Sequence, residues 1–535
     1  MNWFSIIVYV VIGVYMLLNY KRDIHAFQLN SYRLSRFWRW LQDGNVMNAW
    51  HLTDLALLFL MCSTLLIVPL NALIVSIVYV VKIAIIFKTK YKKPLVFTKR
   101  VWRLYTCTGV ISVAGFMSLI LWCGNYSFWG RPDIYSMQVP LASMLLMTTF
   151  SWLIVMIADI IMIPVEKMIN RRYYNDAKRI LKSMPHLKVI GITGSFGKTS
   201  TKHYLHAILS EKYDTLMTPG SYNTTMGVIR TVREHLKPYN EVFICEMGAK
   251  QLKDIKEICD LVHPHCGIIT AVGSMHLETF KSIENVCKTK FELADSIPSD
   301  GFVLINNDFE LAAKRPVRNT NAIRYAVSNT EGADYIATDI VYDNNGTSFT
   351  VKGSDGFELS LKSRLIGECN ISNLLAATVM ALKLGVESVK IQKAVARIEQ
   401  VEHRLSVKRT PGGVTIIDDA FNSNPEGSRM ALEALGNFKT GKRIVVTPGM
   451  IELGDKQDEL NAKLGEHIGK NVDVAIIVGN YNRDAIIEGI KRIDNFEESA
   501  IIIADSFNDA QKILGEILKP GDIVLYENDL PDTFK

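Results

Sequence analysis

The sequence lacks three features that define common classes of protein. It has eight cysteines but no CxxC pair, so it offers no framework of disulfides or zinc ligands. Only 21% of its 535 residues are charged and 48% are hydrophobic, which excludes a disordered or fibrous chain. Residues 171–535 carry 45 Lys and Arg against 48 Asp and Glu. This part of the chain has no basic excess for a nucleic-acid surface, so we expect no nucleic-acid partner.

Nearly all of the long apolar runs lie before residue 170. Four of them, 3–20, 52–87, 104–123 and 138–164, approach or exceed the ~20 residues that a helix needs to cross ~30 Å of hydrocarbon. Residues 1–170 also hold 15 Lys and Arg against 6 Asp and Glu, a basic excess typical of the flanks of membrane spans. We therefore predict an α-helical transmembrane bundle over residues 1–170.

The second apolar run, 52–87, is too long for one comfortable span. The segments on either side of it, 21–51 and 88–103, are rich in Lys and Arg, so both favour the cytoplasm. This predicts a hairpin that turns near Pro69, and a single tilted helix over 55–81 is the alternative. With the hairpin the N-terminus lies outside, the chain after the last span lies in the cytoplasm, and there are five helices: 3–20, 53–70, 71–88, 104–123 and 138–164.

Two segments near the N-terminus affect this interpretation. The first run has no basic n-region and no small-residue cleavage pattern, so we interpret it as a retained anchor and not a signal peptide. The stretch Arg33–Leu41 mixes Arg with Trp and Phe, as a helix lying on anionic headgroups would. A loop packed on the bundle is the alternative for this stretch.

After residue 170, short β-branched runs alternate with helical stretches, which predicts βαβ units and a mostly parallel sheet. The run Leu187–Thr193 leads directly into a glycine-rich turn that contains Lys198 and Thr199. Such a turn binds phosphate, because backbone N–H groups and a helix N-terminus converge on the anion while the lysine adds a positive charge. The hydroxyl after the lysine suits a magnesium ion. The expected nucleotide contacts are Gly194, Ser195, Gly197, Lys198, Thr199 and Ser200.

The sequence of this turn, TGSFGKTS, resembles the Mur ligase family, ATP-dependent enzymes that join a carboxylate to an amine. It is most similar to the branch that adds D-alanyl-D-alanine. Further motifs follow in the family's order between residues 188 and 455. They are the asparagine-rich segment 219–227, Glu246 at the end of the strand 241–247, His276 after the strand 266–272, the GxxNxxNxxAA pattern at 367–377, the EHRL sequence at 402–405, the DDAFNSNP sequence at 418–425, and the GMIELG sequence at 449–454.

Glu246 and His276 follow two apolar strands next to the phosphate-binding turn, and ligands of open α/β sheets bind at the carboxyl ends of strands. Magnesium prefers oxygen ligands, so Thr199 and Glu246 suit a first ion on the ATP phosphates. The family resemblance implies that Lys290 is carbamoylated and binds a second Mg²⁺ together with His276. Lys288, two residues away, is the alternative.

The resemblance also assigns ATP contacts to the later motifs. It implies that Asn370 and Asn373 contact adenine, that Arg404 reaches the γ-phosphate, and that Asp419 contacts ATP. A planar guanidinium suits a transferring phosphoryl group. A plain asparagine-capped helix is the alternative for the two asparagines.

The chain departs from the family at both ends. Residues 1–170 stand where the family has a small domain for a uridine nucleotide sugar, so we expect the carboxylate on a lipid carrier or a membrane-associated glycan of the cell envelope. The ending Glu527–Asp532 is not the basic, glycine-containing ending of the similar branch, and Asn461 replaces a frequent histidine. The amine therefore stays open. The expected domains are a transmembrane bundle (1–170), an ATP-binding domain (171–403) and a Rossmann-like domain (404–535).

The sequence thus predicts a membrane-anchored amide ligase that uses ATP and Mg²⁺ and proceeds through an acyl phosphate. Its partners would be a carboxylate substrate, an amino acid or other amine, and membrane lipid. The expected catalytic residues are Lys198, His276, Lys290 and Arg404. A polymerase resembling the poly-γ-glutamate synthases and a non-catalytic, nucleotide-gated membrane scaffold are the alternatives.

Overall fold

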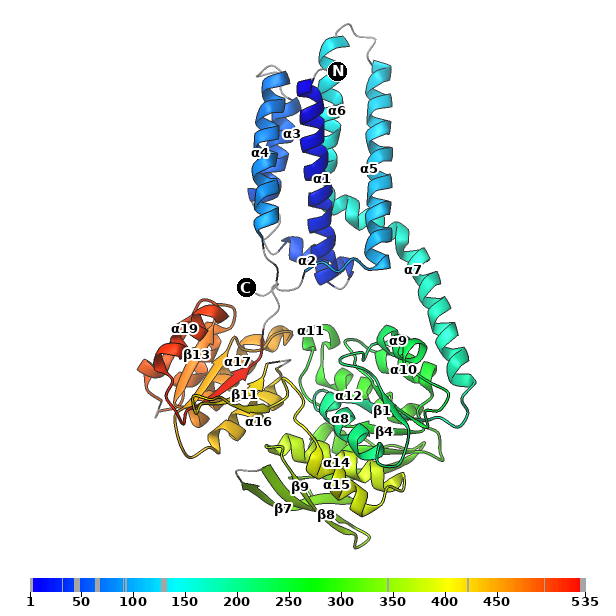
Figure 1. The fold of residues 1–535 in the computed structure, drawn as a ribbon, viewed down its shortest axis with the longest axis vertical. Helices are drawn as coiled ribbons and strands as arrows, with labels where there is room; N and C mark the ends of the chain where they lie inside the picture. The colour runs from blue at the N-terminus through cyan, green and yellow to red at the C-terminus, as the bar shows by residue number, and fades with distance from the viewer. Residues whose placement is uncertain are drawn as a thin grey trace. The chain divides into compact units, whose positions relative to one another are not determined.

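The computed structural model describes residues 3–30, 32–42, 49–62, 68–89, 91, 94–126, 132–343, 346–420, 423–494 and 496–529. The chain divides into two compact units, Met1–Arg171 and Arg172–Lys535. The described residues of the first unit are mostly helical (Figure 1). Its helices are α1 (Trp3–Leu29), α2 (Leu34–Trp40), α3 (Ala49–Cys62), α4 (Val68–Lys88), α5 (Lys99–Tyr126), α6 (Pro132–Thr149) and α7 (Ser151–Lys182), the last of which continues into the second unit.

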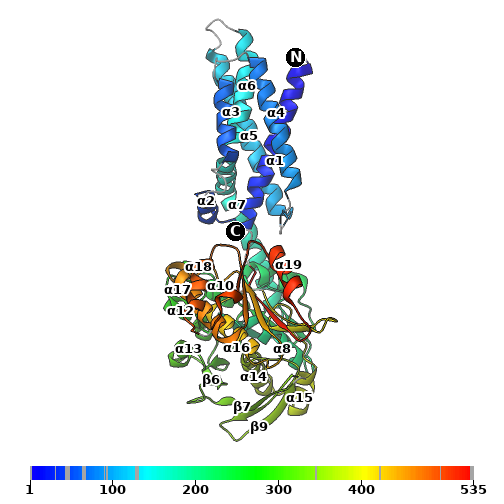
Figure 2. The same cartoon turned by 90° about the vertical axis from the view of Figure 1, so that its left-hand side faces the viewer.

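The helices α1, α3, α4, α5 and α6 run lengthwise beside one another (Figure 2). Three of them, α1, α4 and α5, are long and apolar enough to cross a membrane. The pair α6 and α7 meets the same criteria together but is bent by 70°, and α3 is shorter than a span. By length and composition the described residues thus supply three candidate spans, or four if the bent pair counts as one.

Two helix boundaries differ from the expected ones. The helix α4 begins at Val68, so Pro69 lies in its first turn, where the missing N–H needs no partner, and not at the turn of a hairpin. The residues between α3 and α4, 63–67, lie outside the described residues. The expected single helix over 138–164 is broken at Phe150. Asn19 Nδ2 donates to Thr148 O (3.1 Å) and Ser151 Oγ (2.9 Å), so a side chain from α1 satisfies polar groups at the break.

Three polar side chains inside the first unit, those of Tyr15, Asp54 and Lys82, pair with one another. Lys82 Nζ lies 2.7 Å from Asp54 Oδ1 and donates to Trp50 O, also at 2.7 Å. Tyr15 OH donates to the other carboxylate oxygen at 3.0 Å. These contacts link α1, α3 and α4 and place charge where the sequence shows mainly apolar residues.

The stretch Arg33–Leu41 is mostly helical, with Phe37 fully buried and Trp38 exposed.

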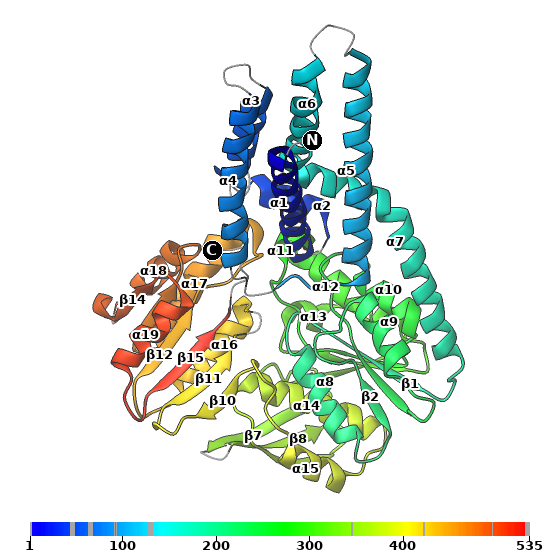
Figure 3. The ribbon, with the colours of Figure 1, turned by 45° about the horizontal axis from the view of Figure 1, so that its top comes forward.

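The second unit begins with a sheet whose strands β1 to β6 are parallel and whose strands β7 to β9 are antiparallel (Figure 3). In the described part of this unit its nine strands are ordered β2-β3-β1-β4-β5-β6-β7-β8-β9. Their bounds are β1 (Lys188–Thr193), β2 (Thr215–Met217), β3 (Val242–Glu246), β4 (Cys266–Ile269), β5 (Phe302–Asn306), β6 (Asn321–Ala326), β7 (Tyr335–Asp343), β8 (Gly346–Gly353) and β9 (Glu358–Ser363). The connecting helices are α8 (Lys198–Leu209), α9 (Thr225–Glu234), α10 (Asp254–Val262), α11 (Leu277–Phe280), α12 (Ile283–Phe291), α13 (Glu310–Lys314), α14 (Glu368–Lys383) and α15 (Ser388–Arg397).

A second sheet follows, and it is parallel apart from the edge strand β10. Its order over the described residues is β10-β11-β15-β12-β13-β14. The strands are β10 (Ser406–Arg409), β11 (Thr415–Asp419), β12 (Arg443–Thr447), β13 (Val474–Val478), β14 (Ile501–Ala504) and β15 (Ile523–Glu527), and the helices are α16 (Pro425–Gly436), α17 (Gln457–Asn471), α18 (Arg483–Lys491) and α19 (Phe507–Ile517). The expected alternation of strands and helices after residue 170 is confirmed.

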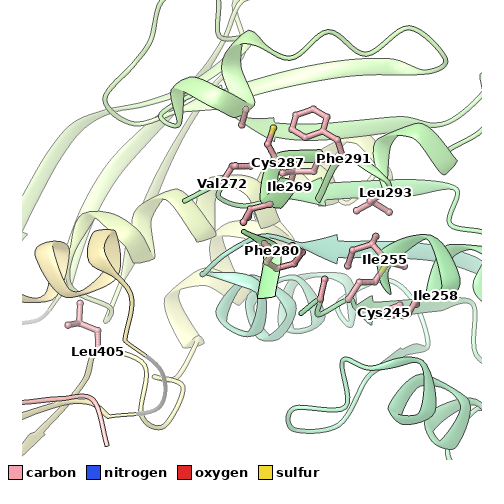
Figure 4. Close-up of a cluster of buried hydrophobic side chains, with 14 of the residues drawn as sticks. Cys245, Ile255, Ile258, Ile269, Val272, Phe280, Cys287, Phe291, Leu293 and Leu405 are labelled. Atoms are coloured by element: carbon pink, nitrogen blue, oxygen red, sulfur yellow. The ribbon is translucent and has the colours of Figure 1, made fainter. Parts of the chain in front are cut away.

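Buried apolar side chains fix the strand ends that carry the site. Parallel strands covered on both faces are almost continuously apolar, and all five residues of β3 are buried. Figure 4 shows Ile269 and Val272 packed with Cys287 and Phe291 of α12. The strand β1 lies between β3 and β4, with Ile192 opposite Glu246. The carboxyl ends of these three strands therefore meet at one edge of the sheet.

Candidate active site

The turn between β1 and α8 requires glycine at two positions. Gly194 and Gly197 have φ angles of +156° and +78°. A Cβ on Gly194 would lie 2.1 Å from Thr270 Oγ1, and one on Gly197 would lie 2.5 Å from Asn373 Oδ1. Ser195 Oγ fastens the turn by donating to Gly273 O at 3.0 Å. The backbone thus forms the close, rigid turn that the sequence predicts for phosphate.

Lys198, the first residue of α8, folds over this turn. Its Nζ donates to Gly194 O (2.7 Å) and Ser195 O (3.1 Å). Burial and the positive charge of Arg404 lower the pKa of Lys198 to about 8, although Glu246 opposes this. Burial also lowers the pKa of Arg404. An anion bound beside a buried lysine stabilises its charged form, so a polyphosphate at this turn suits Lys198.

Glu246 ends β3 beside the turn, as predicted. Thr199 Oγ1 donates to Glu246 Oε1 at 3.2 Å, Asn223 Nδ2 donates to the same oxygen at 3.0 Å, and Lys202 Nζ lies 2.9 Å from Oε2. Burial would raise the pKa of Glu246, but Lys202 and Lys198 lower it below its usual value. An ionised carboxylate next to a hydroxyl is a suitable pair of oxygen ligands for Mg²⁺.

The structure distinguishes Lys290 from Lys288. Both are on α12, but Lys290 is 3% exposed whereas Lys288 is exposed to solvent. Burial and the charge of Lys198 lower the pKa of Lys290 to about 7. Much of its amine is therefore uncharged near neutral pH, and the uncharged amine is the nucleophilic form.

His276 precedes α11 with a φ of +53°. Its Nδ1 forms a hydrogen bond with a carboxylate oxygen of Glu452. Burial lowers the pKa of His276 although Glu452 opposes this shift, and the charge of Lys290 lowers it further. Among the described residues, His, Cys, Asp and Glu alone form no group of three that could hold a metal ion. A magnesium site built from the described residues would therefore include ligands of other kinds, such as the Thr199 hydroxyl beside Glu246 or a carbamate on Lys290 beside His276.

The two asparagines of α14 differ in their surroundings. Asn373 lines a small cavity, of about 20 Å³, together with Phe196, Asn306 and Phe309. Asn370 instead accepts a hydrogen bond from Tyr204 OH at 2.7 Å and is not among the lining residues. The structure therefore does not bring Asn370 to the cavity with Asn373. Gly367, and not an asparagine, precedes the helix, so the asparagine-cap alternative is wrong.

The lining residues Asn306 and Phe309 were not expected from the sequence. Asn306 is the last residue of β5 and Phe309 lies three residues beyond it, and the Asn-Asn-Asp sequence of residues 306–308 is the signal that could have identified them. A larger cavity, of about 550 Å³, shares Asp308, Phe309 and Glu368 with the small one. Its other walls include residues of α16 and α17. A cavity of this size is typical of small-molecule sites.

Asp419 is the last residue of β11, and the charges of Arg404 and Asp419 each oppose the effect of burial on the pKa of the other. Leu405 N donates to Asp419 Oδ1 at 3.0 Å. Burial raises the pKa of Asp419 to about 6, and Arg404 opposes that shift. Phe421 and Asn422, from the same motif as Asp419, lie outside the described residues.

Comparison with known proteins assigns both domains of the second unit. Residues 192–381 match the family model "Mur ligase middle domain", and residues 403–526 match "Mur ligase, glutamate ligase domain". The UDP-N-acetylmuramoyl-tripeptide–D-alanyl-D-alanine ligase of Mycobacterium bovis is 30% identical over 365 residues, which cover 63% of this chain and 70% of the relative. The Bacillus subtilis protein of the same name is 27% identical and covers 64% of this chain and 72% of its own.

Solved structures give the same result. The MurF ligase of Thermotoga maritima, in complex with ADP, has a TM-score of 0.59 and 27% identity, and covers 67% of this chain and 80% of its own. MurF from Acinetobacter baumannii has a TM-score of 0.61 and 25% identity, with 68% of this chain and 78% of its own covered.

Fold and site together define an α/β ligase with a phosphate-binding turn and a separate C-terminal Rossmann-like domain. The chain belongs to the Mur ligase family, whose members form amide bonds with ATP and Mg²⁺ in cell-wall biosynthesis. The resemblance inferred from the sequence motifs is confirmed.

Proposed function

We propose that this chain is a membrane-anchored ligase that joins the carboxylate of a lipid-linked or membrane-associated cell-envelope glycan to an amine. The observation that carries the proposal is the helical unit of residues 1–171, with its three long apolar helices, ahead of a Mur ligase site. Neither family model extends into residues 1–191. The bundle would anchor the protein in the bacterial cytoplasmic membrane, with the ligase domains in the cytoplasm, and would receive the lipid-linked substrate.

The reaction would proceed through an acyl phosphate. A substrate carboxylate oxygen attacks the γ-phosphorus of ATP and ADP leaves. The amine then attacks the acyl carbon, loses a proton, and phosphate leaves from the tetrahedral intermediate. Lys198 and Arg404 would hold the phosphate oxygens and offset their charge, which requires positioning and not a covalent enzyme intermediate.

Two groups of residues fit magnesium. Thr199 and Glu246, 3.2 Å apart, would hold one ion, and His276 with a carbamate on Lys290 would hold the other. Bound Mg²⁺ neutralises charge on the phosphates as they transfer. The carbamate would form when the uncharged Lys290 amine attacks CO₂ and loses a proton, and the pKa of about 7 makes that amine available.

A second candidate is the reaction for which the relatives are named. They are ligases of UDP-N-acetylmuramoyl-tripeptide and D-alanyl-D-alanine, and 30% identity to one of them favours this pair. The segment Glu527–Asp532, which begins at the last residue of β15, lacks the basic, glycine-containing pattern of the similar branch, which argues for a different amine, and the helical unit argues for a different acid.

The test is an assay of ADP formation by the full-length protein in lipid nanodiscs. Glycan carboxylates on lipid and on nucleotide carriers would each be offered with an amino acid or dipeptide. The proposal predicts ADP release that needs both a lipid-linked acid and an amine, and none from Lys198→Ala. Turnover with the nucleotide-linked acid alone would favour the second candidate. A polymerase would give products of many lengths, and a scaffold would give no amine-dependent ADP.

A further inference from the structure

Glu452 has no part in the mechanism above, although it lies in the GMIELG segment that the family shares. This segment follows β12 in the C-terminal domain, yet the Glu452 carboxylate is hydrogen-bonded to the imidazole of His276 in the middle domain. Glu278 N also donates to Glu452 O at 3.3 Å. Side chain and backbone of one residue thus join the two domains next to a predicted metal ligand.

The Glu452 loop is fixed to its own domain. Met450 N donates to Asn461 Oδ1 at 2.9 Å, and Asn482 Nδ2 donates to Pro448 O at the same distance. Leu453 N donates to Gln457 Oε1 at 3.3 Å. The carboxylate is therefore presented by a rigid loop, so its position depends on the position of the whole domain.

Both partners of the contact have unfavourable backbone angles. Glu452 and His276 have φ values of +62° and +53°, in the left-handed region that non-glycine residues rarely adopt. Such conformations persist where the surroundings fix them, and they concentrate at functional sites. Their occurrence in two residues that contact each other favours a functional contact between the domains.

A carboxylate in this place has a defined effect on a histidine. Metal-binding histidines donate the second ring N–H to a carboxylate or carbonyl, which fixes the tautomer and the ring orientation. With Nδ1–H directed at Glu452, the lone pair of Nε2 is free for a metal ion. Lys250 Nζ lies 3.7 Å from Glu452 Oε1, on the other oxygen of the carboxylate that contacts His276.

We propose that Glu452 is a positioning residue for the magnesium site of His276 and Lys290, and that this site is complete only while the two ligase domains are packed together. This inference rests on the proposed function. It makes binding of one metal ion depend on domain packing, because the group that orients a ligand in one domain belongs to the other.

The test counts metal ions without turnover. The full-length protein in detergent, with bicarbonate and a non-hydrolysable ATP analogue, is titrated with Mn²⁺ in place of Mg²⁺, and free Mn²⁺ is measured by EPR. We expect two classes of site in the wild type. Glu452→Ala should weaken one class by about 10- to 100-fold and leave the other unchanged. Glu452→Gln, which keeps the shape but not the charge, should weaken the same class.

Glu488→Gln is the matched control, since this carboxylate is 69% exposed, belongs to the same domain and pairs with Arg492. It should bind Mn²⁺ as the wild type does. Hydrogen exchange of residues 277–281 provides a second readout. Faster exchange in Glu452→Ala with both Mn²⁺ classes unchanged would overturn the inference, because Glu452 would then be only a domain contact. A wild type without nucleotide-dependent Mn²⁺ binding would instead overturn the proposed function.

Discussion

Lys290 and Lys288 lie two residues apart on α12 and meet different environments. Because a helix turns by about 100° per residue, a step of two places them on opposite faces. One face packs against the middle-domain core, which buries Lys290, and the other meets solvent. The sequence left both lysines as candidates for the carbamate. Their burial decides in favour of Lys290, since only a buried amine has its pKa lowered to about 7.

Lys290→Ala should lower kcat on the order of 100-fold, the loss typical of removing one charge-stabilising group from an active site. Lys288→Ala should stay close to the wild type because its side chain is solvated. Wild-type enzyme depleted of CO₂ should lose activity and regain it with bicarbonate, whereas Lys290→Ala should not respond. Steady-state ADP release measures the activity of Lys290→Ala, of Lys288→Ala and of the wild type with and without bicarbonate. Bicarbonate rescue that depends on Lys288 would reverse the assignment.

Glu527 is a second residue whose behaviour follows from burial. It is 1% exposed, pairs in register with Asp419 across β11 and β15, and its Oε2 accepts no hydrogen bond within the described part of the chain. Burial and the charge of Asp419 raise its pKa well above 4.5. The folded protein thus binds a proton that the unfolded chain releases, so stability falls as pH rises above 4.5.

Glu527→Gln should therefore stabilise the protein at pH 8 by roughly 1–3 kcal/mol, since a neutral isostere replaces a poorly partnered buried acid. The gain should vanish below pH 4.5, where the carboxyl is protonated in both states. Thermal unfolding across pH measures the difference. An equal gain at every pH would show that the effect is packing and not ionisation.

At the scale of elements, the strands and their site residues could be predicted, and the helix break could not. A parallel strand covered on both faces is an apolar run, and the residues that follow it lie at the ligand edge, so Glu246 and His276 were identified from the sequence alone. At the break at Phe150, Asn19 donates a hydrogen bond to Thr148 O, which lies 129 positions away along the chain. The sequence around Phe150 does not show that a residue so far away along the chain will contact it, so the break could not be predicted. Asn306 and Phe309 were missed although Asp308 lies between them, because Asn and Asp at the end of a strand are equally typical of an ordinary turn.

The ion pair between Asp54 and Lys82 joins α3 to α4 inside the first unit, with side-chain exposures of 0% and 7%. Lys82→Met should destabilise the protein by about 3–5 kcal/mol because it leaves a buried charge without its partner. The double variant Asp54→Leu/Lys82→Met should recover most of that loss. Thermal unfolding in detergent compares the three proteins. A double variant less stable than Lys82→Met would show that the pair itself, and not the orphaned charge, determines stability.

At the scale of the whole molecule, the account assigns separate tasks to the two units. The nucleotide contacts argued above lie after residue 193, in the second unit. The first unit would receive the lipid-linked acid substrate in the membrane. A chimera in which an unrelated membrane helix replaces residues 1–150 should bind Mg·ADP as the wild type does but lose ligation of a lipid-linked acid. Calorimetry measures the binding of Mg·ADP, and ADP release measures ligation. Full ligation by a folded chimera would show that the bundle only anchors the protein and does not bind the substrate.

The measurement that tests the central claim most directly is a mass comparison of lipid-linked glycans from cells with the wild-type chain and cells with Lys198→Ala. Lys198 folds over the phosphate-binding turn, so its loss should abolish phosphoryl transfer while the helical unit stays intact. The account predicts a lipid-linked glycan that lacks the mass of one amine or amino-acyl unit in the variant, which would identify both substrates. Identical lipid-linked glycans, with the difference found only among nucleotide-linked precursors, would contradict it.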